Sequence, residues 1–398
     1  MLFANRVPLM CAAILASSSA AFPQAPFTDA ALLTGGAGGY HTYRIPAVVR
    51  TASGRVLLFL EGRRDSQSDF GQTDLLLLVS DDRGATWSSP SIVHRDESAK
   101  DVTIGNTVPV YDAENDTVVL AFTRNNERVF VTRSENEGDT WAPPRDITAD
   151  VTPRGKGWFR YWTGPGHGIQ LVHGPKRGRM LFPCYHLEDD GERNVMRSHM
   201  IYSDDGGDTW HVGQSTEIGP EIEADKVTDR RRWVKGHDGR YHWAGCECMA
   251  VERTDGSLYL TVRNQVMYKH TKAYAVSQDA GETWTPLALQ DELPGVKVQS
   301  GIADYPDDDD KNRILWSSIP ETGDRRNLSV YLSEDAARTF PVSRTVFNGP
   351  SAYSDLLVLP DKTILLFYEG GAQHRYEQIR LARFTLDWVV GDREPTGR

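Results

Sequence analysis

The stretch S-D-D-R-G-A-T-W, residues Ser80–Trp87, decides the fold because the chain repeats it. The pattern S-x-D-x-G-x-T-W returns at Ser203–Trp210 and Ser277–Trp284, and at Ser134–Trp141 with an asparagine in the aspartate position. A weaker copy, with alanine in place of the glycine, spans Ser333–Phe340. Recurrence of one pattern along a chain is the sequence signature of a repeat architecture.

Each octad has the composition of a tight turn that follows a β-strand. The Asp82 side chain can accept hydrogen bonds from backbone N–H groups just ahead of it, Gly84 permits a positive φ, and Trp87 buries an apolar face. Strand patterns precede the octads, as at Asp74–Val79 and Ala273–Val276. The octads start 54, 69, 74 and 56 residues apart, which suits one four-stranded sheet with its loops.

These octads resemble the Asp boxes of the sialidase superfamily, whose fold is a six-bladed β-propeller. The resemblance therefore implies an all-β, six-bladed propeller. About 370 residues follow residue 25, and roughly 60 residues per blade agree with six blades. Asp boxes also occur in propellers that are not enzymes, so they predict the fold better than the activity.

The first 25 residues have the pattern of a secretory signal peptide. Arg6 supplies the positive charge, Val7–Ala16 is apolar, and small residues follow at Ser17–Ala21. We expect cleavage between Ala20 and Ala25, a single catalytic propeller domain over residues 26–398, and a secreted, periplasmic or extracellular protein. The apolar run is shorter than the roughly 20 residues of a spanning helix, so no membrane span is expected.

The composition is that of an ordinary globular protein, with 39% hydrophobic and 25% charged residues. The formal net charge is −11, and the basic residues do not gather into a stripe, which argues against a nucleic-acid partner. The oligomeric state stays open.

Three cysteines follow the expected signal peptide, namely Cys184, Cys246 and Cys248. An odd number in a large chain argues against a disulfide framework, although one bond from Cys184 stays open. Strand alternation would place Cys246 and Cys248 on one face and Glu247 on the other. Without a second Cys or His pair at zinc-like spacing, we expect no metal site.

Other residues match the sialidase family in order, from about Tyr43 to Trp388. The segment Tyr43-Arg44-Ile45-Pro46 looks like the family's Y/F-R-I-P signature, which implies that Arg44 binds the substrate carboxylate. A planar guanidinium matches a carboxylate at two points. Arg63, in Glu-Gly-Arg, is expected beside the substrate, and Glu369, in a segment similar to the family's L-L-Y-E strand, is expected to orient Arg44.

The resemblance assigns the acid/base to Asp69, in Ser-Asp-Phe-Gly, rather than to the nearby Asp65 or Asp74. An acid/base must hold a proton near neutral pH. We therefore expect burial or neighbouring negative charge to raise the pKa of Asp69.

Two further segments supply the base and the remaining arginines of the family pattern. Glu247, followed sixteen residues on by Arg263 in Val-Arg-Asn, resembles the family's base and second carboxylate-binding arginine. The third arginine is Arg325 or Arg326, and the family spacing favours Arg325. Adjacent strand side chains point to opposite faces, so only one of the two can enter the site.

Tyr353, in Ala-Tyr-Ser-Asp-Leu, is close to the family's nucleophile signature. A phenol with a pKa near 10 is a poor nucleophile at neutral pH, so a nearby glutamate must accept its proton. The sugar acid carries a carboxylate on its anomeric carbon, which repels an anionic nucleophile and favours tyrosine. The segment Trp158–Ile169 also resembles a loop that walls the family's pocket, and Asn106 is a further candidate for substrate recognition.

Together these residues imply a retaining exo-α-sialidase that needs no cofactor and acts on sialylated glycans, glycoproteins or glycolipids. One alternative is a non-catalytic, glycan-binding Asp-box propeller, which would need the arginines but not Asp69, Glu247 and Tyr353 together. Another alternative keeps the enzyme but changes the substrate to a related 2-keto-3-deoxy sugar acid.

Overall fold

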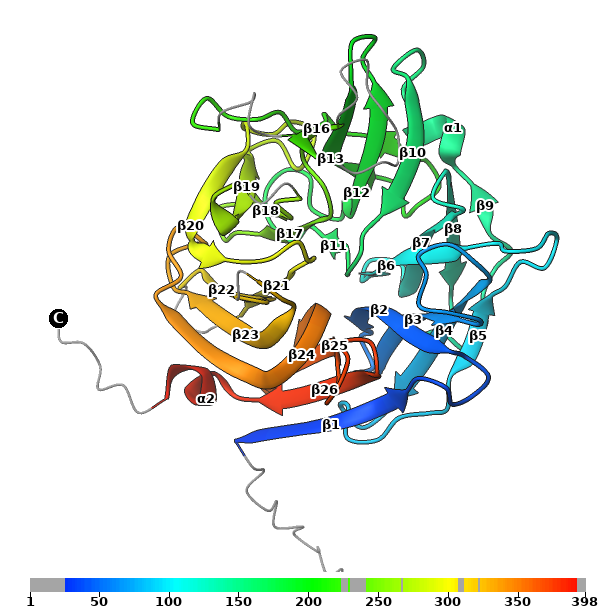
Figure 1. Cartoon of the computed structure of the whole chain (residues 1–398), viewed down its shortest axis with the longest axis vertical. Helices are drawn as coiled ribbons and strands as arrows, with labels where there is room; N and C mark the ends of the chain where they lie inside the picture. Colours follow the sequence, from blue (N-terminus) through cyan, green and yellow to red (C-terminus); the bar gives the residue numbers. More distant parts are fainter. Residues whose placement is uncertain are drawn as a thin grey trace, which may run out of the picture.

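The strands of the chain are arranged around one central axis, with their sheets pointing outward (Figure 1). This computed structural model describes residues 26–222, 228–229, 241–265, 268–306, 311–320 and 323–391. The expected signal peptide, residues 1–25, lies outside the described residues.

Three of the sheets have four antiparallel strands each, in sequence order. The first contains β2 (Thr42–Arg50), β3 (Val56–Arg63), β4 (Thr73–Ser80) and β5 (Ser91–His94). The second contains β6 (Ile104–Asp112), β7 (Thr117–Arg124), β8 (Arg128–Ser134) and β9 (Arg145–Asp146). The third contains β17 (Cys248–Glu252), β18 (Leu258–Val262), β19 (Thr271–Ser277) and β20 (Ala288–Pro294).

Two sheets have seven strands each. One contains β10 (Trp158–Thr163), β11 (Ile169–Gln170), β12 (Met180–Asp189), β13 (Asn194–Ser203), β14 (His211–Val212), β15 (Thr228–Asp229) and β16 (Tyr241–Ala244). The other contains β1 (Phe27–Thr34), β21 (Gly301–Tyr305), β22 (Arg313–Ser318), β23 (Arg326–Ser333), β24 (Val342–Val358), β25 (Ile364–Gly370) and β26 (Gln378–Phe384).

Within the described ranges, helices are few and short. They are α1 (Thr148–Val151), α2 (Leu386–Val390) and the 3₁₀ turn η2 (Tyr268–His270). In the part of the chain that the structure describes, no helix has the length and apolar character to cross a membrane.

The prediction of an all-β propeller is confirmed, but the expected six separate sheets are not found. Hydrogen bonds join the described strands into five sheets. The reason is β24, whose 17 residues form one continuous strand. Its first part pairs with β23, as at Leu332 and Val342, and its last part pairs with β25, as at Val358 and Ile364.

The ring closes by pairing the first described strand with the last. Strand β1 runs antiparallel to β26, with Phe27 opposite Phe384 (Figure 1, blue beside red). The Phe27 ring also stacks on Trp388 with the ring centroids 4.5 Å apart. The two ends of the described chain are thereby held in one sheet.

Neighbouring sheets bury each other's faces, which explains the continuous apolar runs in the inner strands. All eight residues of β3 are buried, whereas β5, at the outer edge of the same sheet, is exposed or half-buried. Leu57 and Phe59 pack with Val118 and Leu120 of the next sheet in one hydrophobic cluster. The inner strands are therefore rigid supports for side chains near the axis.

All five octads form turns after the third strand of a sheet. In the first, the Asp82 carboxylate accepts hydrogen bonds from the backbone N–H groups of Ala85 and Thr86 at 3.0 and 2.8 Å. The weakest copy keeps this geometry because Ala337 adopts a φ of 58°, where the other copies have glycine. The Ala337 N–H donates to the Ser333 hydroxyl at 2.9 Å. The turn therefore tolerates loss of the glycine.

Candidate active site

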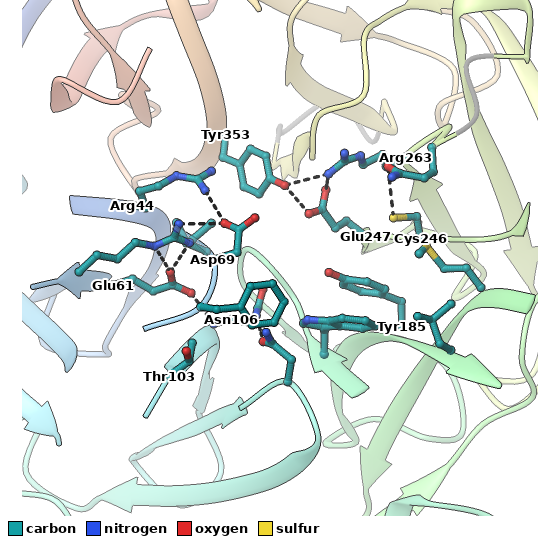
Figure 2. A pocket seen from close by; sticks show the side chains of 18 of the residues that line it. Arg44, Glu61, Asp69, Thr103, Asn106, Tyr185, Cys246, Glu247, Arg263 and Tyr353 are labelled. Atoms are coloured by element: carbon teal, nitrogen blue, oxygen red, sulfur yellow. Dashed lines mark hydrogen bonds and ion pairs between the residues drawn. The ribbon is translucent and has the colours of Figure 1, made fainter. Parts of the chain in front are cut away.

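One cavity of about 250 Å³ brings together all seven catalytic and substrate-binding residues predicted from the sequence. Figure 2 shows Arg44 and Asp69 on one side of it, Glu247 and Arg263 on the other, and Tyr353 between them. The seven residues that line the cavity are Arg44, Arg63, Asp69, Glu247, Arg263, Arg325 and Tyr353. They come from three different sheets and their loops, so the propeller is what assembles the site.

Tyr353, on β24, lies at the centre of a buried hydrogen-bond cluster. Its hydroxyl donates to Oε1 of Glu247, and Nη1 of Arg263 donates to the same hydroxyl at 2.9 Å. Nη1 of Arg263 also contacts Oε2 of Glu247 at 2.6 Å. Glu247 is therefore correctly placed to accept the phenolic proton, and Arg263 to stabilise the negative charge that develops.

The electrostatics of this cluster favour the protonated phenol. Burial raises the pKa of Tyr353, and the negative charge of Glu247 raises it further, against the opposing effect of Arg263, Arg325 and Arg44. A neutral phenol avoids the cost of burying a second anion beside Glu247. The tyrosine can then act as a nucleophile only if its proton moves to Glu247 as a bond forms.

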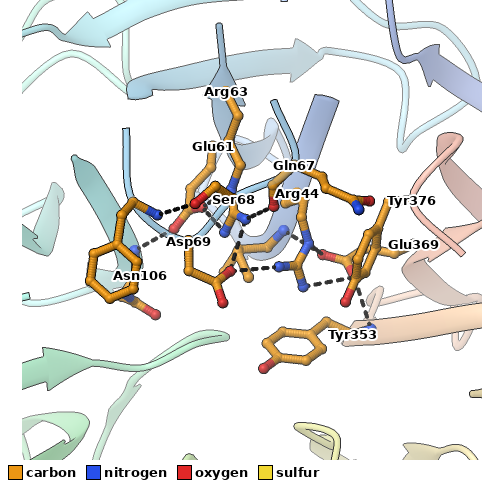
Figure 3. A network of polar contacts seen from close by, with 12 residues as sticks. Arg44, Glu61, Arg63, Gln67, Ser68, Asp69, Asn106, Tyr353, Glu369 and Tyr376 are labelled. Atoms are coloured by element: carbon orange, nitrogen blue, oxygen red, sulfur yellow. Dashed lines mark hydrogen bonds and ion pairs between the residues drawn. The ribbon is translucent and has the colours of Figure 1, made fainter. Parts of the chain in front are cut away.

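Arg44, on β2, is held by Glu369 of β25, as Figure 3 shows. Nε and Nη2 of Arg44 donate to the two carboxylate oxygens of Glu369 at 3.0 and 3.2 Å. Glu369 also accepts the backbone N–H groups of Ile45 and Tyr353 at 2.9 and 3.3 Å. Burial lowers the pKa of Arg44, but Glu369, Tyr376, Asp69 and Tyr353 together outweigh burial, and the net shift is well upward. One carboxylate thus connects the arginine to the tyrosine strand.

Asp69 lies in the loop between β3 and β4, with its carboxylate open to the cavity. Oδ1 accepts from Nη1 of Arg44 at 3.1 Å and from Nη1 of Arg63 at 2.8 Å (Figure 3). Arg63 is itself fixed by Glu61, whose Oε2 accepts from Nε and Nη2 at 2.9 and 2.7 Å.

The expected upward pKa shift of Asp69 is wrong. Burial in the cavity does raise the pKa of Asp69, but the positive charges of Arg44 and Arg63 lower it by more, so the net shift is downward. The expectation failed because the nearest charges are guanidinium groups and not carboxylates.

The two rival aspartates lie elsewhere. Asp74 is fully buried and does not line the cavity; it accepts from the Tyr40 hydroxyl at 2.7 Å and pairs with Arg64 and Arg95. Asp65 is exposed and lies outside the residues that line the cavity. Of the three, only Asp69 faces the other candidate residues.

Arg325 enters the cavity, whereas Arg326 begins β23 and is exposed. Nη1 of Arg325 donates to the Tyr376 hydroxyl at 2.9 Å, and Nη2 donates to the backbone carbonyl of Lys297. Among the described residues, no carboxylate contacts the guanidinium of Arg325, because Asp324 accepts only its backbone N–H, at 2.7 Å. It is therefore the arginine of the cavity whose charge is least neutralised.

The alternation expected around Glu247 is wrong. Cys246 and Glu247 both line the cavity, whereas Cys248 is buried, with its thiol 3.4 Å from the carbonyl oxygen of Cys184. Alternation holds only within a strand, and β17 begins at Cys248, after Gly245 with a φ of 148°. In the described part of the chain none of the three cysteines forms a disulfide.

The opposite wall of the cavity is largely apolar and was only partly predicted. Trp162, from the predicted pocket loop, stacks on Tyr185 with ring centroids 4.7 Å apart and an angle of 8°. Leu187 and Met196 extend this wall, and Asn106 lies on the polar side near Glu61. The wall therefore presents an apolar surface opposite the arginines.

Two further residues that line the cavity, Glu61 and Tyr376, differ in whether the sequence marks them. Glu61 stands two residues before Arg63 on a strand, and that spacing places both side chains on one face, so it could have been found. Tyr376 lies in a loop, stacked under Arg44 at 4.1 Å, and no local pattern marks it. Within the described residues, no group of three or more His, Cys, Asp or Glu side chains is arranged to hold a metal ion.

Comparison with known proteins gives a consistent picture. The profile of the BNR repeat-like domain family matches residues 54–367. The chain is 28% identical over 390 residues to a sialidase of Micromonospora viridifaciens, covering 92% of this chain and 55% of that protein. It is 27% identical over 400 residues to an exo-alpha-sialidase of Aspergillus fumigatus, covering 88% of this chain and 86% of that protein.

Solved structures agree with the fold. The structure of Hadza microbial sialidase Hz136 superposes with a TM-score of 0.72 at 23% identity, covering 88% of this chain and 67% of that chain. An intramolecular trans-sialidase from Ruminococcus gnavus gives a TM-score of 0.71 at 17% identity, covering 91% of this chain and 98% of that chain. At these identities the likeness concerns the fold alone.

Proposed function

Because the chain belongs to the sialidase family of BNR-repeat proteins, we propose that it is a retaining exo-α-sialidase. The proposed reaction removes a terminal, α-linked sialic acid, or a related 2-keto-3-deoxy sugar acid, from a glycan. One observation carries the proposal: a buried tyrosine donates its proton to a glutamate inside a cavity lined by arginines.

The substrate carboxylate is proposed to bind Arg44, Arg263 and Arg325. Arg44 and Arg263 already pair with Glu369 and Glu247, so much of their charge is neutralised before the substrate arrives. Arg325 supplies the unneutralised charge, and it lies 5.5 Å from the Tyr353 ring centroid. The carboxylate is thereby held beside the nucleophile, where orientation lowers the barrier.

Tyr353 is proposed to attack the anomeric carbon while its proton passes to Glu247. The bond to the leaving oxygen breaks, and Asp69 donates a proton to that oxygen. In the second half, water replaces the tyrosine, Asp69 accepts the proton of the water, and Glu247 returns its proton to Tyr353. Two displacements at one carbon retain its configuration.

The lowered pKa of Asp69 fits this scheme, because binding of the substrate carboxylate would reverse the shift. A substrate carboxylate that binds Arg44 competes with Asp69 for Nη1 of that arginine and adds a negative charge nearby. Both effects raise the pKa of Asp69. The acid then holds its proton when the substrate is bound.

Release of 4-methylumbelliferone from a panel of α-linked keto-acid sugars tests the proposal. The purified protein should hydrolyse at least one member of the panel, and the preferred member identifies the sugar. Silence on all of them, together with measurable binding of a sialylated glycan, would support the non-catalytic, glycan-binding alternative.

Replacing Tyr353 with phenylalanine tests the nucleophile. The variant keeps the ring that packs in the cavity but lacks the attacking oxygen, so turnover should nearly disappear while substrate binding stays measurable. A single-turnover kinetic assay measures the loss of reaction, and calorimetry measures the retained substrate binding. An unimpaired Tyr353→Phe variant removes Tyr353 from the mechanism.

Three finer points belong to the same proposal. In this proposal the seven-stranded sheet that contains β24 is two blades that share this strand, which makes six blades in all. Residues 1–25 are a cleaved secretory signal, and residues 26–398 form one catalytic domain. The protein is then secreted, periplasmic or extracellular.

A further inference from the structure

Lys272, on β19, is a fully buried lysine that the proposed reaction does not use. Only 1% of it is exposed, and its Nζ donates to the carbonyl oxygens of Val296 and Val298 at 3.1 and 2.6 Å. Burial lowers the pKa of Lys272, and the nearby charge of Arg263 lowers it further. A buried amine is costly unless its hydrogen bonds stabilise something the fold needs.

The two carbonyls belong to residues 295–299, which connect β20 to β21. We call residues 295–299 the connector. The backbone of Gly295 packs closely against the Lys272 side chain. A Cβ added to Gly295 would lie 2.6 Å from Cε of Lys272. Lys272 therefore contacts the connector at Gly295, Val296 and Val298, and these contacts fix its path.

The connector in turn contacts the site in two places. The carbonyl oxygen of Lys297, between the two carbonyls that Lys272 holds, accepts from Nη2 of Arg325. The side-chain oxygen of Gln299 accepts from the backbone N–H of Ser354, next to Tyr353, at 3.2 Å. Lys272 thus binds the carbonyls of the residues on either side of Lys297, while the carbonyl of Lys297 itself binds Arg325.

We propose that Lys272 is a positioning residue, which holds the connector so that Arg325 points at the substrate carboxylate. This inference rests on the proposed function, since it concerns the arginine assigned to that carboxylate. Its effect is on substrate binding, because Lys272 touches neither the nucleophile nor its base in any hydrogen bond.

The test compares steady-state kinetics of the whole protein carrying Lys272→Met, which keeps the apolar stem and removes the donors. KM for the preferred 4-methylumbelliferyl substrate should rise about tenfold, with a smaller change in kcat, which is the pattern of lost binding. The matched control is Lys176→Met, a half-exposed surface lysine paired with Asp204, which should leave both constants unchanged.

A second variant perturbs the same contact without replacing the lysine. In Gly295→Ala the added methyl group should push the end of the Lys272 side chain aside and raise KM about threefold. This change disturbs the core less than Lys272→Met. If Lys272→Met does not fold, Gly295→Ala decides the question. A folded form of either variant with the wild-type KM overturns the proposal.

Coupling to Arg325 separates positioning from general damage. If Lys272 acts through Arg325, adding Lys272→Met to an Arg325→Lys background should raise KM less than twofold further. Independent, multiplying effects on KM overturn the proposal. Wild-type protein that hydrolyses no keto-acid sugar contradicts the proposed function instead, so the two failures are distinguishable.

Discussion

Asp69 and Tyr353 face the same cavity, yet their surroundings shift their pKa values in opposite directions. Arg44 and Arg63 hold the pKa of Asp69 below its ordinary value, whereas burial and Glu247 raise that of Tyr353. Asp69 is therefore ionised and the Tyr353 phenol is neutral at neutral pH. The proposed mechanism requires the reverse for both, and it assigns that task to the substrate carboxylate for Asp69 and to Glu247 for Tyr353.

Asp69→Asn should reveal the role of the acid through the leaving group. A sugar leaving group needs a proton, so hydrolysis of a sialyl-oligosaccharide should fall about 10²- to 10⁴-fold. The 4-methylumbelliferone anion leaves without one, so the first step on that substrate should fall much less. Burst and steady-state kinetics on both substrates check this, and an equal loss on both would contradict a role as proton donor.

Individual site residues were predictable where a local motif marks them. Arg44, Glu247 and Tyr353 stand in short motifs, and the structure brings all of them to one cavity. Tyr376 and Tyr185 were missed, because their contacts are made across loops and sheets distant in sequence. The pKa of Asp69 was missed for the same reason, since it depends on which charges the fold brings near.

At the scale of elements, the segment 164–168 links several sheets next to the axis. Gly164 donates its N–H to the carbonyl of Pro183 at 2.6 Å, and Gly168 donates to that of Pro109 at 3.0 Å. Nδ1 of His167 lies 2.8 Å from Oδ1 of Asp355, two residues after Tyr353 on β24. The segment thus contacts strands β12, β6 and β24.

His167→Asn should lower stability in a pH-dependent way. Burial lowers the pKa of His167, but Asp355 and then Asp304 raise it by more, so the net shift is upward. A raised folded-state pKa gives stability that is fully present below the unfolded value of about 6.5 and is lost as pH rises through the folded value. Asparagine keeps a donor but carries no charge.

Denaturant unfolding at pH 5.5 and pH 9 measures this difference. The gap in unfolding free energy between wild type and His167→Asn should be larger at pH 5.5. A gap that does not change with pH would mean that the contact contributes no charge interaction.

The turns were the most predictable elements and β24 the least. The octads predict their turns because the side chains that stabilise each turn form hydrogen bonds within the same eight residues, as Asp82 does. Strand β24 continues through Asn348-Gly349-Pro350, a sequence typical of a turn. Pairing on both sides of it, including the Ser351 N–H to the Arg325 carbonyl at 3.0 Å, outweighs that local preference.

For the whole molecule, closure of the ring depends on β1 beside β26. Asp29 of β1 pairs with Arg380 of β26 at 2.7 Å and accepts from the buried Tyr368 hydroxyl at 2.7 Å. Closure was not predicted, because nothing near residue 27 specifies a partner more than 300 residues away.

Asp29→Ala should weaken closure without touching the cavity. It leaves Arg380 and the Tyr368 hydroxyl without their carboxylate, which should cost about 1–3 kcal/mol of unfolding free energy. Asp208→Ala, which removes the exposed partner of Arg133, is the matched control and should change it by less than about 0.5 kcal/mol. Thermal and urea unfolding check both, and equal losses would contradict a special role for the closing strands.

The most direct test of the central claim is peptide mapping by mass spectrometry after incubation with a 2,3-difluorosialic acid. Attack by the nucleophile displaces the anomeric fluoride, and the remaining fluorine slows release of the sugar. The proposed mechanism predicts that one fluorosugar is attached to the peptide containing Tyr353, at its phenolic oxygen. Attachment to another residue, or turnover of substrate without any adduct under these conditions, would contradict it.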